Sequence, residues 1–361
     1  MDTKQDATGP GAVLAGCPPT RRIAVLRRTL VGLLALTLVI TGCTSRPVSN
    51  TTPAPDQVRL QLKWVPQAQF AGYYAASARG FYAAEGLDVT IRPGGPDTPA
   101  EDLVAGGQAD IGVGWLSSLL AARDHGRPLV NIAQIFGASG MRQIAFASSG
   151  IRGPADLRGR RIAVWFAGNE YPLLATLDKY GIDRARDVTL VPQPFDMRLL
   201  LDRSVDAAAA MTYNEYRQVL EAGVRADDLV VIDFNREGTA MLEDGLFTTK
   251  AWLARPGHRS IAARFLRASL RGWALCRDRP AECVDIVLAQ SPTLGRLHQT
   301  WMMAEINKLI WNAGTPDADI GRMNADAFWR TAAIALRFGV IQRAATTDAF
   351  THEVWELARR P

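Results

Sequence analysis

The sequence is poor in the residues that build metal and redox centres. Its 361 residues include four cysteines and four histidines, and no group of them has the close spacing that zinc or iron–sulfur ligands require. No two cysteines have the CxxC spacing of thiol oxidoreductases. We therefore expect neither a structural nor a catalytic metal site.

An excess of one sign of charge is also missing from most of the chain. The formal net charge is +5, and residues 1–42 hold five basic and two acidic residues of the total. The remainder is close to balanced, with 36 basic and 34 acidic residues. A nucleic-acid-binding surface needs a basic face or stripe, so we do not expect nucleic acid as a partner.

The apolar run at residues 30–40 is too short to cross a bilayer. It follows Arg27 and Arg28, which loosely resemble a twin-arginine signal, and it ends at Cys43. This is the layout of a secretory signal, and residues 40–43 resemble a bacterial lipobox, in which the cysteine is lipidated. We expect a signal peptide at residues 1–42, lipidation at Cys43 and a flexible tether at residues 43–57. The alternative is an uncleaved anchor helix.

Two cysteines, Cys276 and Cys283, lie beyond the signal and flank a short segment that contains Pro280. The proline is expected to break a helix there. In an exported protein the two thiols can oxidise to a disulfide across that turn. The alternative is two buried, unpaired thiols, and the sequence leaves both open.

A pattern of strands and helices occurs twice in the chain. Three segments of residues 59–111 match three segments of residues 160–207 in the same order, at separations of 101, 99 and 96 positions. In each copy the first strand ends on a tryptophan, Trp64 or Trp165. This repetition predicts two lobes of similar construction. The alternation of strand and helix predicts mostly parallel sheets flanked by helices.

The division of the chain into lobes follows from this repeat. We expect the first part of lobe 1 at residues 58–148, lobe 2 at residues 149–230, and a return to lobe 1 at residues 231–361. The last part is strongly helical, and because the duplicated pattern has ended there, we expect its helices to pack on lobe 1. They are predicted at residues 261–277, 281–290, 297–312, 324–338 and 346–358.

Aromatic, amide and carboxylate side chains gather where the predicted strands end. In open α/β sheets the loops at the carboxyl ends of strands hold the ligand. Aromatic faces stack on a flat ring, while amides and carboxylates hydrogen-bond its edge, so this set suits a planar heterocycle. The predicted ligand-binding residues are Trp64, Gln67, Gln69, Phe70, Trp115 and Ser117 from lobe 1, and Trp165, Asn169, Glu170, Tyr171, Tyr213, Asn214 and Glu215 from lobe 2.

Several of these residues also suit purely structural roles. The alternative for Trp64 and Phe70 is that they are core aromatics at the start of a helix. Asn169 and Ser117 are good helix N-caps, and Glu170 is favoured in the first turn of a helix. The sequence does not decide between these roles and ligand binding.

The first loop and its surroundings resemble a known family. Residues 62–74 (LKWVPQAQFAGYY), 80–82, 85–89, 107–112 and 211–216 are similar to periplasmic binding proteins of ABC importers. The subgroup is the one related to thiamine-pyrimidine precursor binders and to the yeast-type thiamine pyrimidine synthase, and the resemblance covers about residues 58–340. Within it, the chain is most similar to importer lipoproteins for riboflavin or a thiamine-type pyrimidine.

The resemblance implies a two-lobed Venus-flytrap fold that closes on a small heterocyclic ligand without a cofactor. It also implies an ABC permease and its ATPase as partners, and, with the lipobox, a location on the outer face of the cell membrane. We expect a monomer. A binder of sulfonates or nitrate on the same fold would need cationic side chains in the cleft, and we expect these loops to lack them.

The synthases of the same subgroup provide an enzyme alternative, which forms the hydroxymethylpyrimidine moiety from histidine and pyridoxal phosphate. They use a lysine, a histidine and a cysteine-rich run. In this sequence Arg123 falls at the position of the lysine, Phe70 falls at a position of the histidine, and residues 243–248 contain no cysteine. An arginine does not form the Schiff base that a lysine forms. We therefore expect binding without catalysis.

Overall fold

The computed structural model describes residues 54–95, 98–166, 168–311 and 316–360. The predicted signal peptide, residues 1–42, and the predicted lipidation site, Cys43, lie outside the described residues. Strand β1 begins at Asp56, so the predicted tether, which ended at residue 57, is two residues too long. None of the helices in the described part has the length and apolarity to cross a membrane.

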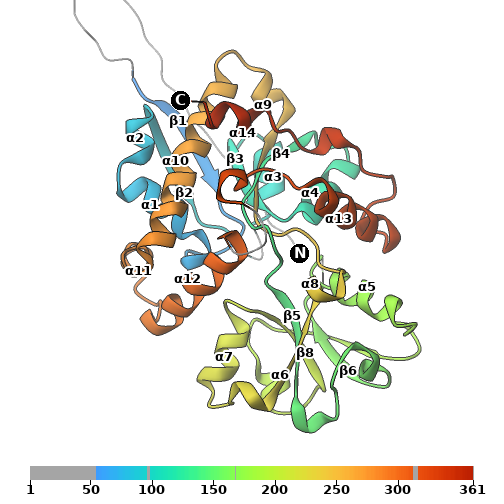
Figure 1. The fold of residues 1–361 in the computed structure, drawn as a ribbon. Helices are drawn as coiled ribbons and strands as arrows, with labels where there is room; N and C mark the ends of the chain where they lie inside the picture. The colour runs from blue at the N-terminus through green and yellow to red at the C-terminus, as the bar shows by residue number, and fades with distance from the viewer. Residues whose placement is uncertain (1–53, 96–97, 167, 312–315, 361) are drawn as a thin grey trace, which may run out of the picture. The chain divides into compact units, whose positions relative to one another are not determined.

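Five strands form the sheet of lobe 1, in the order β2-β1-β3-β10-β4 (Figure 1). Strands β1, β2, β3 and β4 run in one direction, and β10 runs against its neighbours β3 and β4. Strands β3 and β4 are buried along their whole lengths, as expected for strands with helices on both faces. The bounds are β1 (Asp56–Gln61), β2 (Leu87–Arg92), β3 (Ile111–Gly114), β4 (Leu129–Gln134) and β10 (Gly245–Thr249).

The sheet of lobe 2 repeats this arrangement in the order β7-β6-β8-β5-β9. Four of its strands run in one direction, and β5 runs against its neighbours β8 and β9. The predicted α/β fold of two lobes with mostly parallel sheets is therefore confirmed. The bounds are β5 (Met141–Phe146), β6 (Arg161–Val164), β7 (Thr189–Pro192), β8 (Ala207–Met211) and β9 (Leu229–Asp233).

The antiparallel strand of each sheet is the one that enters from the other lobe. Strand β5 follows β4 of lobe 1, and β10 follows β9 of lobe 2. The crossings therefore lie at residues 135–140 and 234–244, whereas the sequence placed them after residues 148 and 230. The error has a physical reason: a buried apolar strand such as β5 fits either sheet, and only its pairing with β8 and β9 decides which.

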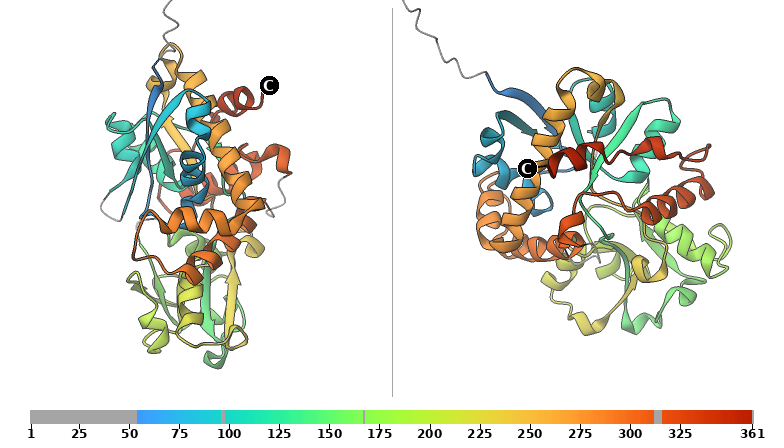
Figure 2. Two further views of the ribbon diagram at one scale, coloured as in Figure 1. Left: turned by 90° about the vertical axis from the view of Figure 1, so that its left-hand side faces the viewer. Right: turned by 45° about the horizontal axis from the view of Figure 1, so that its top comes forward.

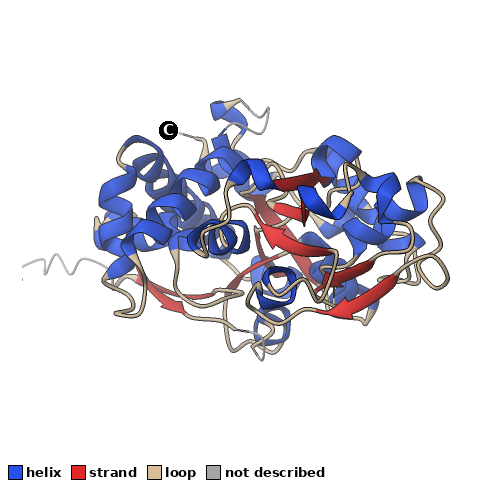
Figure 3. Ribbon diagram, turned by 90° about the horizontal axis from the view of Figure 1, so that it is seen from below, coloured by secondary structure: helices blue, strands red, loops and turns tan. Residues whose placement is uncertain are grey.

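Helices cover both faces of the strands (Figure 3). Lobe 1 contains the short 3-10 helix η1 (Ala68–Phe70), and the second crossing contains α8 (Phe234–Glu237). The helices of lobe 1 are α1 (Ala71–Ala78), α2 (Phe81–Ala84), α3 (Ala100–Ala105), α4 (Leu116–Asp124), α9 (Lys250–Ala254), α10 (His258–Asp278), α11 (Pro280–Leu288), α12 (Arg296–Trp311), α13 (Ala325–Arg337) and α14 (Glu353–Ala358). Those of lobe 2 are α5 (Tyr171–Lys179), α6 (Arg198–Leu201) and α7 (Glu215–Glu221).

The C-terminal helices pack on lobe 1, as predicted (Figure 2). Helix α10 approaches α1 closely, because a glycine stands on each side. A Cβ atom at Gly272 would lie 2.0 Å from the backbone oxygen of Gly72, and one at Gly72 would lie 2.2 Å from the Trp273 ring. A larger residue at either position would push the two helices apart and open the core around Trp273.

Cys276 in α10 and Cys283 in α11 form a disulfide, with their Cα atoms 5.3 Å apart. Pro280 is the first residue of α11, where its missing N–H costs no helical hydrogen bond. The chain therefore turns between the two helices, and this turn brings the two buried cysteines together. The disulfide is one of the two arrangements that the sequence left open.

Candidate functional site

A pocket of about 170 Å³ lies where the two lobes face each other. Most of the residues that the sequence singled out line it. The predicted lining residues are Trp64, Gln67, Gln69, Trp115, Trp165, Asn169, Tyr213, Asn214 and Glu215, and the ones that were missed are Lys63, Phe195 and Met211.

Four predicted residues lie outside this lining. Phe70 is 0% exposed and Ser117 is 1% exposed, because both side chains face the interior of lobe 1. The carboxylate of Glu170 accepts a hydrogen bond from the backbone N–H of Gly168, at 2.8 Å, and so stabilises its own loop. Tyr171, at the start of α5, packs against the hydrophobic clusters instead. Of the structural alternatives, Phe70 takes the predicted place in the core, whereas Ser117 is the second residue of α4 and not its N-cap, and Glu170 precedes the first turn of α5.

The first loop is held in shape by a chain of amide groups. Gln67 donates from Nε2 to Oε1 of Gln69 at 2.6 Å, and Gln69 donates from Nε2 to Oδ2 of Asp244 at 2.8 Å. The backbone N–H of Ala68 donates to the side chain of Gln299 on α12, at 2.7 Å. This loop therefore depends on two segments that are distant in the sequence.

Asp244 lies behind the lobe 1 wall of the pocket, where it bonds to two of the lining residues. It is 2% exposed, and its second carboxylate oxygen accepts a hydrogen bond from Nε1 of Trp115 at 3.0 Å. Burial raises the pKa of Asp244, while Lys63 and the hydrogen bonds from Gln69 and Trp115 offset part of that rise. The carboxylate thus fixes one amide and one indole of the pocket wall.

Lys63 provides a cation at the pocket, which corrects the expectation that the loops lack one. Its Nζ atom lies 4.3 Å from the centroid of the Trp115 ring, a distance suited to a cation–π interaction. Burial raises the pKa values of Asp244 and Glu101, and the charge of the ammonium group offsets part of both rises. Lys63 therefore interacts electrostatically with two buried carboxyl groups as well as with the Trp115 ring.

The wall from lobe 2 follows the end of β8. Glu215 accepts hydrogen bonds from the backbone N–H of Met211, at 3.0 Å, and from Nδ2 of Asn214, at 2.7 Å. Burial raises the pKa of Glu215 and raises that of Tyr213 well above its ordinary value. The Tyr213 hydroxyl is consequently neutral at physiological pH.

Aromatic rings from both lobes meet at this pocket. The ring centroids of Trp64 in lobe 1 and Phe195 in lobe 2 lie 5.1 Å apart, with the planes tilted by 54°. Trp165 donates from Nε1 to the backbone oxygen of Pro194 at 3.1 Å, which holds the loop that carries Phe195. The lining offers flat apolar faces together with polar groups, which is the composition that binds planar heterocycles.

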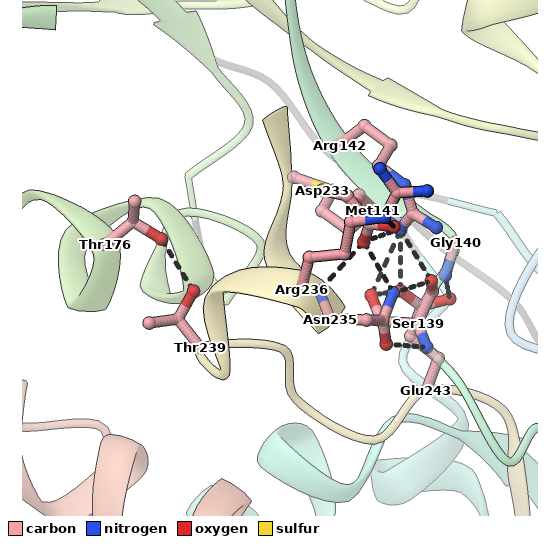
Figure 4. A network of polar contacts seen from close by, with 10 residues as sticks. All are labelled: Ser139, Gly140, Met141, Arg142, Thr176, Asp233, Asn235, Arg236, Thr239 and Glu243. Carbon is pink, nitrogen blue, oxygen red and sulfur yellow. Dashed lines mark hydrogen bonds and ion pairs between the residues drawn. The ribbon is translucent and has the colours of Figure 1, made fainter. Parts of the chain in front are cut away.

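Glu243, the neighbour of Asp244, joins the two crossings between the lobes (Figure 4). Its carboxylate accepts hydrogen bonds from the backbone N–H groups of Gly140, at 3.0 Å, and Met141, at 3.1 Å, and from the hydroxyl of Ser139. Burial raises the pKa of Glu243 to about 7. The pair of acids therefore links the hinge to the pocket, since Glu243 binds the first crossing and Asp244 binds the pocket wall.

Sequence reasoning missed Glu243 and Asp244, although a signal was present. The two acids stand between apolar residues 240–242 and the start of β10, and acidic residues inside an apolar segment are rarely buried unless they are paired. Phe195 was missed because it lies in a proline-rich loop outside the repeated motifs. Its place in the pocket lining, beside Trp64, follows only from the folded arrangement of the two lobes.

Known proteins with similar sequences are receptors and synthases. The chain is 27% identical over 350 residues to the riboflavin-binding protein RibY of Chloroflexus aurantiacus, which covers 91% of this chain and 97% of the relative. It is 24% identical to the formylaminopyrimidine-binding protein of Halalkalibacterium halodurans, over 83% of this chain and 90% of the relative. A 4-amino-5-hydroxymethyl-2-methylpyrimidine phosphate synthase of Legionella pneumophila is 27% identical over 66% of this chain and 75% of its own.

Solved structures show the same fold at low sequence identity. The periplasmic aliphatic sulphonate binding protein SsuA of Escherichia coli superposes with a TM-score of 0.61 at 16% identity, covering 82% of this chain and 91% of its own. The family model described as NMT1/THI5 like matches residues 67–283, which include both crossings and all of the pocket lining except Lys63 and Trp64. The chain belongs to the NMT1/THI5-like family.

Proposed function

We propose that this protein is an extracytoplasmic receptor that binds a planar heterocycle between its lobes and delivers it to an ABC permease and its ATPase. The observation that carries the proposal is the pocket between the lobes, with aromatic faces on both sides and hydrogen-bonding groups around them. Relatives named for binding riboflavin and formylaminopyrimidine support the same class of ligand.

The size of the pocket favours a single ring. Its volume is about 170 Å³, and a protein cavity of about 150 Å³ accepts benzene. A pyrimidine with small substituents fits this space. Riboflavin, with three fused rings, fits only when the lobes stand further apart.

The polar groups of the pocket also match an aminopyrimidine. Glu215 is an acceptor for an exocyclic amino group, while Lys63 and Gln67 are donors for ring nitrogens or a carbonyl oxygen. The sequence has no glycine-rich loop followed by lysine of the kind that holds phosphates. We therefore propose an unphosphorylated heterocycle as the ligand.

Catalysis finds less support than binding. Arg123, at the position of the synthase lysine, donates to the backbone oxygen of Leu129 and to Asp348 at 2.7 Å, away from the pocket lining. Phe70 lies in the core. Lys63 is the lysine at this pocket, so a visible pyridoxal-phosphate absorbance that Lys63→Ala abolishes, together with product formation, would favour the synthase alternative.

Export and anchoring are proposed from residues 1–43 alone. We infer that the signal peptide is removed and that Cys43 carries a lipid, which holds the receptor at the outer face of the membrane near its permease. Mass spectrometry of the full chain expressed in a bacterium should find an acylated N-terminus at Cys43. In the Cys43→Ser variant the lipid should be lost and the protein should leave the membrane fraction.

The test of ligand binding is a fluorescence titration of residues 44–361 with formylaminopyrimidine and with riboflavin. Three tryptophans line the pocket, so a ligand that stacks there should quench their emission in a saturable way. Saturation at micromolar concentration or below supports the proposal and identifies the ligand. No quenching by either compound, with pyridoxal phosphate binding instead, contradicts it.

A further inference from the structure

Phe195 reaches from lobe 2 to the other lobe. Its side chain is 60% exposed, and it belongs to none of the three hydrophobic clusters that the described residues form. Its aromatic partner is Trp64 of lobe 1, whose ring centroid lies 5.1 Å away. The ring of Phe195 therefore contributes to the space between the lobes and not to the core of the lobe that carries it.

The loop that carries Phe195 is fixed on both sides of the ring. Before it, the buried side chain of Gln193 donates from Nε2 to the backbone oxygen of Ala209, at 2.7 Å, and accepts from the backbone N–H of the same residue, at 2.9 Å. After it, the carboxylate of Asp196 accepts from the backbone N–H of Arg198 at the start of α6, at 3.1 Å. The backbone at Phe195 is therefore tied to β8 and to α6.

The loop that carries Trp64 is fixed in a similar way. The backbone oxygen of Trp64 accepts a hydrogen bond from the backbone N–H of Gly94, at 2.9 Å. A Cβ atom at Gly94 would lie 2.2 Å from the backbone oxygen of Leu62 and 2.7 Å from the backbone nitrogen of Trp64, so only glycine allows the two segments to approach this closely. The two rings therefore meet on supported loops, one from each lobe.

The distance between the two rings leaves no room for a third ring. Carbon atoms of packed groups are in contact at about 3.5–4.0 Å, so a ligand ring between Trp64 and Phe195 would need them about 7–8 Å apart. Their centroids are 5.1 Å apart, and the two rings touch each other directly. A ligand in this arrangement therefore lies beside the pair, in the pocket of about 170 Å³, and the pair forms one of the walls.

We propose that Phe195 is a specificity-determining residue of the ligand site: its contact with Trp64 limits the pocket to a single ring and excludes fused-ring compounds. The inference rests on the proposed function, because it concerns the ligand of the same pocket. A single-ring ligand fits beside the two rings and allows the lobes to close. A fused-ring ligand extends past them, separates the two rings and so favours the open state. Without the ring of Phe195, the pocket gains space of about the size of that ring.

The experiment measures the dissociation constants of formylaminopyrimidine and of riboflavin for residues 44–361, which contain all of the described residues. For the wild type we expect formylaminopyrimidine to bind at least about tenfold more tightly than riboflavin. In Phe195→Ala this preference should fall by about tenfold or more, mainly because riboflavin binds more tightly. Phe195→Tyr keeps an aromatic ring at this position, so it should keep the preference of the wild type.

Phe166→Ala is the matched control. Phe166 is also an exposed aromatic residue of lobe 2, at 44% exposure, but it lies outside the pocket lining. Its replacement should leave both dissociation constants at their wild-type values. If the wild type binds riboflavin as tightly as formylaminopyrimidine, or if Phe195→Ala keeps the wild-type preference, the inference is wrong.

Failure of the proposed function gives a different result. If neither compound binds the wild type, that function is contradicted, and the inference is then judged on the ligand-free chain by fluorine NMR of protein labelled with fluorotryptophan. The resonance of Trp64 is identified by its loss in Trp64→Phe. A shift of this resonance in Phe195→Ala, but not in Phe166→Ala, supports closure of the pocket by the two rings. An unchanged Trp64 resonance in Phe195→Ala overturns the inference.

Discussion

Nε2 of Gln69 lies 2.8 Å from Oδ2 of Asp244, although the two residues are 175 positions apart in the chain. One belongs to the loop after the first strand, and the other ends the second crossing between the lobes. A buried carboxylate is tolerated only with hydrogen-bond partners. This bond therefore makes the shape of the pocket depend on the position of the second crossing, residues 234–244.

Asp244→Ala should weaken both folding and ligand binding. The substitution leaves Nε2 of Gln69 and Nε1 of Trp115 without their acceptor, and each unpaired buried donor costs about 1–3 kcal/mol. Urea unfolding monitored by circular dichroism, combined with ligand titration, measures both effects. Asp244→Asn is the matched variant, because its single oxygen can still accept one of the two bonds. Equal stability for Asp244→Ala and the wild type would contradict the role of this carboxylate.

Trp64→Ala should weaken ligand binding by roughly 1–3 kcal/mol if the ring stacks on the ligand. Tyr213→Ala should have an effect of similar size, since it faces the same pocket from lobe 2. The control is Trp329→Ala, which removes a tryptophan that is 45% exposed on α13 and is not part of the lining. Fluorescence or calorimetric titration measures all three. Unchanged affinity in both pocket variants would place the ligand elsewhere.

The free energy of unfolding should fall as the pH rises through neutrality, because of Glu243. Burial raises the pKa of this carboxyl from 4.5 to about 7, so the folded protein holds the proton more tightly than the unfolded chain. The resulting stabilisation is complete below about pH 4 and is lost as the pH rises through about 7. The raised pKa corresponds to a decrease of about 3 kcal/mol in the free energy of unfolding between the low-pH and high-pH ends of this range.

Urea unfolding at several pH values between about 5 and 8 measures this loss. Glu243→Gln does not titrate, and its stability should change less over the same range than that of the wild type. Glu353→Gln is the control, since Glu353 is half exposed in a surface ion pair with Arg259. Parallel pH profiles for wild type and Glu243→Gln would contradict the assignment.

Removal of the disulfide should destabilise the protein without changing the ligand site. Cys276 and Cys283 are seven positions apart, and closing a loop of this length contributes about 2 kcal/mol through the entropy of the unfolded chain. The double variant Cys276→Ser, Cys283→Ser should therefore melt at a lower temperature. Its ligand affinity should match the wild type, because both cysteines lie outside the pocket. A large loss of affinity would show that α10 and α11 control the cleft.

The sequence predicts those features of the structure that depend on residues close together in the chain. Strands β4 and β9, at residues 129–134 and 229–233, are short apolar runs bounded by turns, which is the pattern that indicates a strand in a sequence. Trp64, Trp165 and Tyr213 were placed at the pocket because each one lies within three residues of the end of a strand in the repeated unit. Local spacing was sufficient for these residues.

The sequence does not predict features that depend on contacts between residues far apart in the chain. Strand β10 was not predicted, and β5 was assigned to the wrong lobe, since strand pairing is a property of the folded chain and not of the strand itself. Asp244 acquires its role from Gln69 and Trp115, which belong to other elements. Phe70 has the composition of a ligand-stacking residue, but its ring faces the core, because the direction of one side chain in a loop is set by tertiary packing.

The most direct test of the account is a calorimetric titration of residues 44–361 with formylaminopyrimidine, repeated with a variant that carries Trp64→Ala and Tyr213→Ala. The account predicts one site per chain, with a dissociation constant in the micromolar range or below, and at least about tenfold weaker binding by the variant. Binding of equal strength by both proteins would contradict the location of the site. No binding of formylaminopyrimidine or riboflavin to the wild type would contradict the receptor function itself.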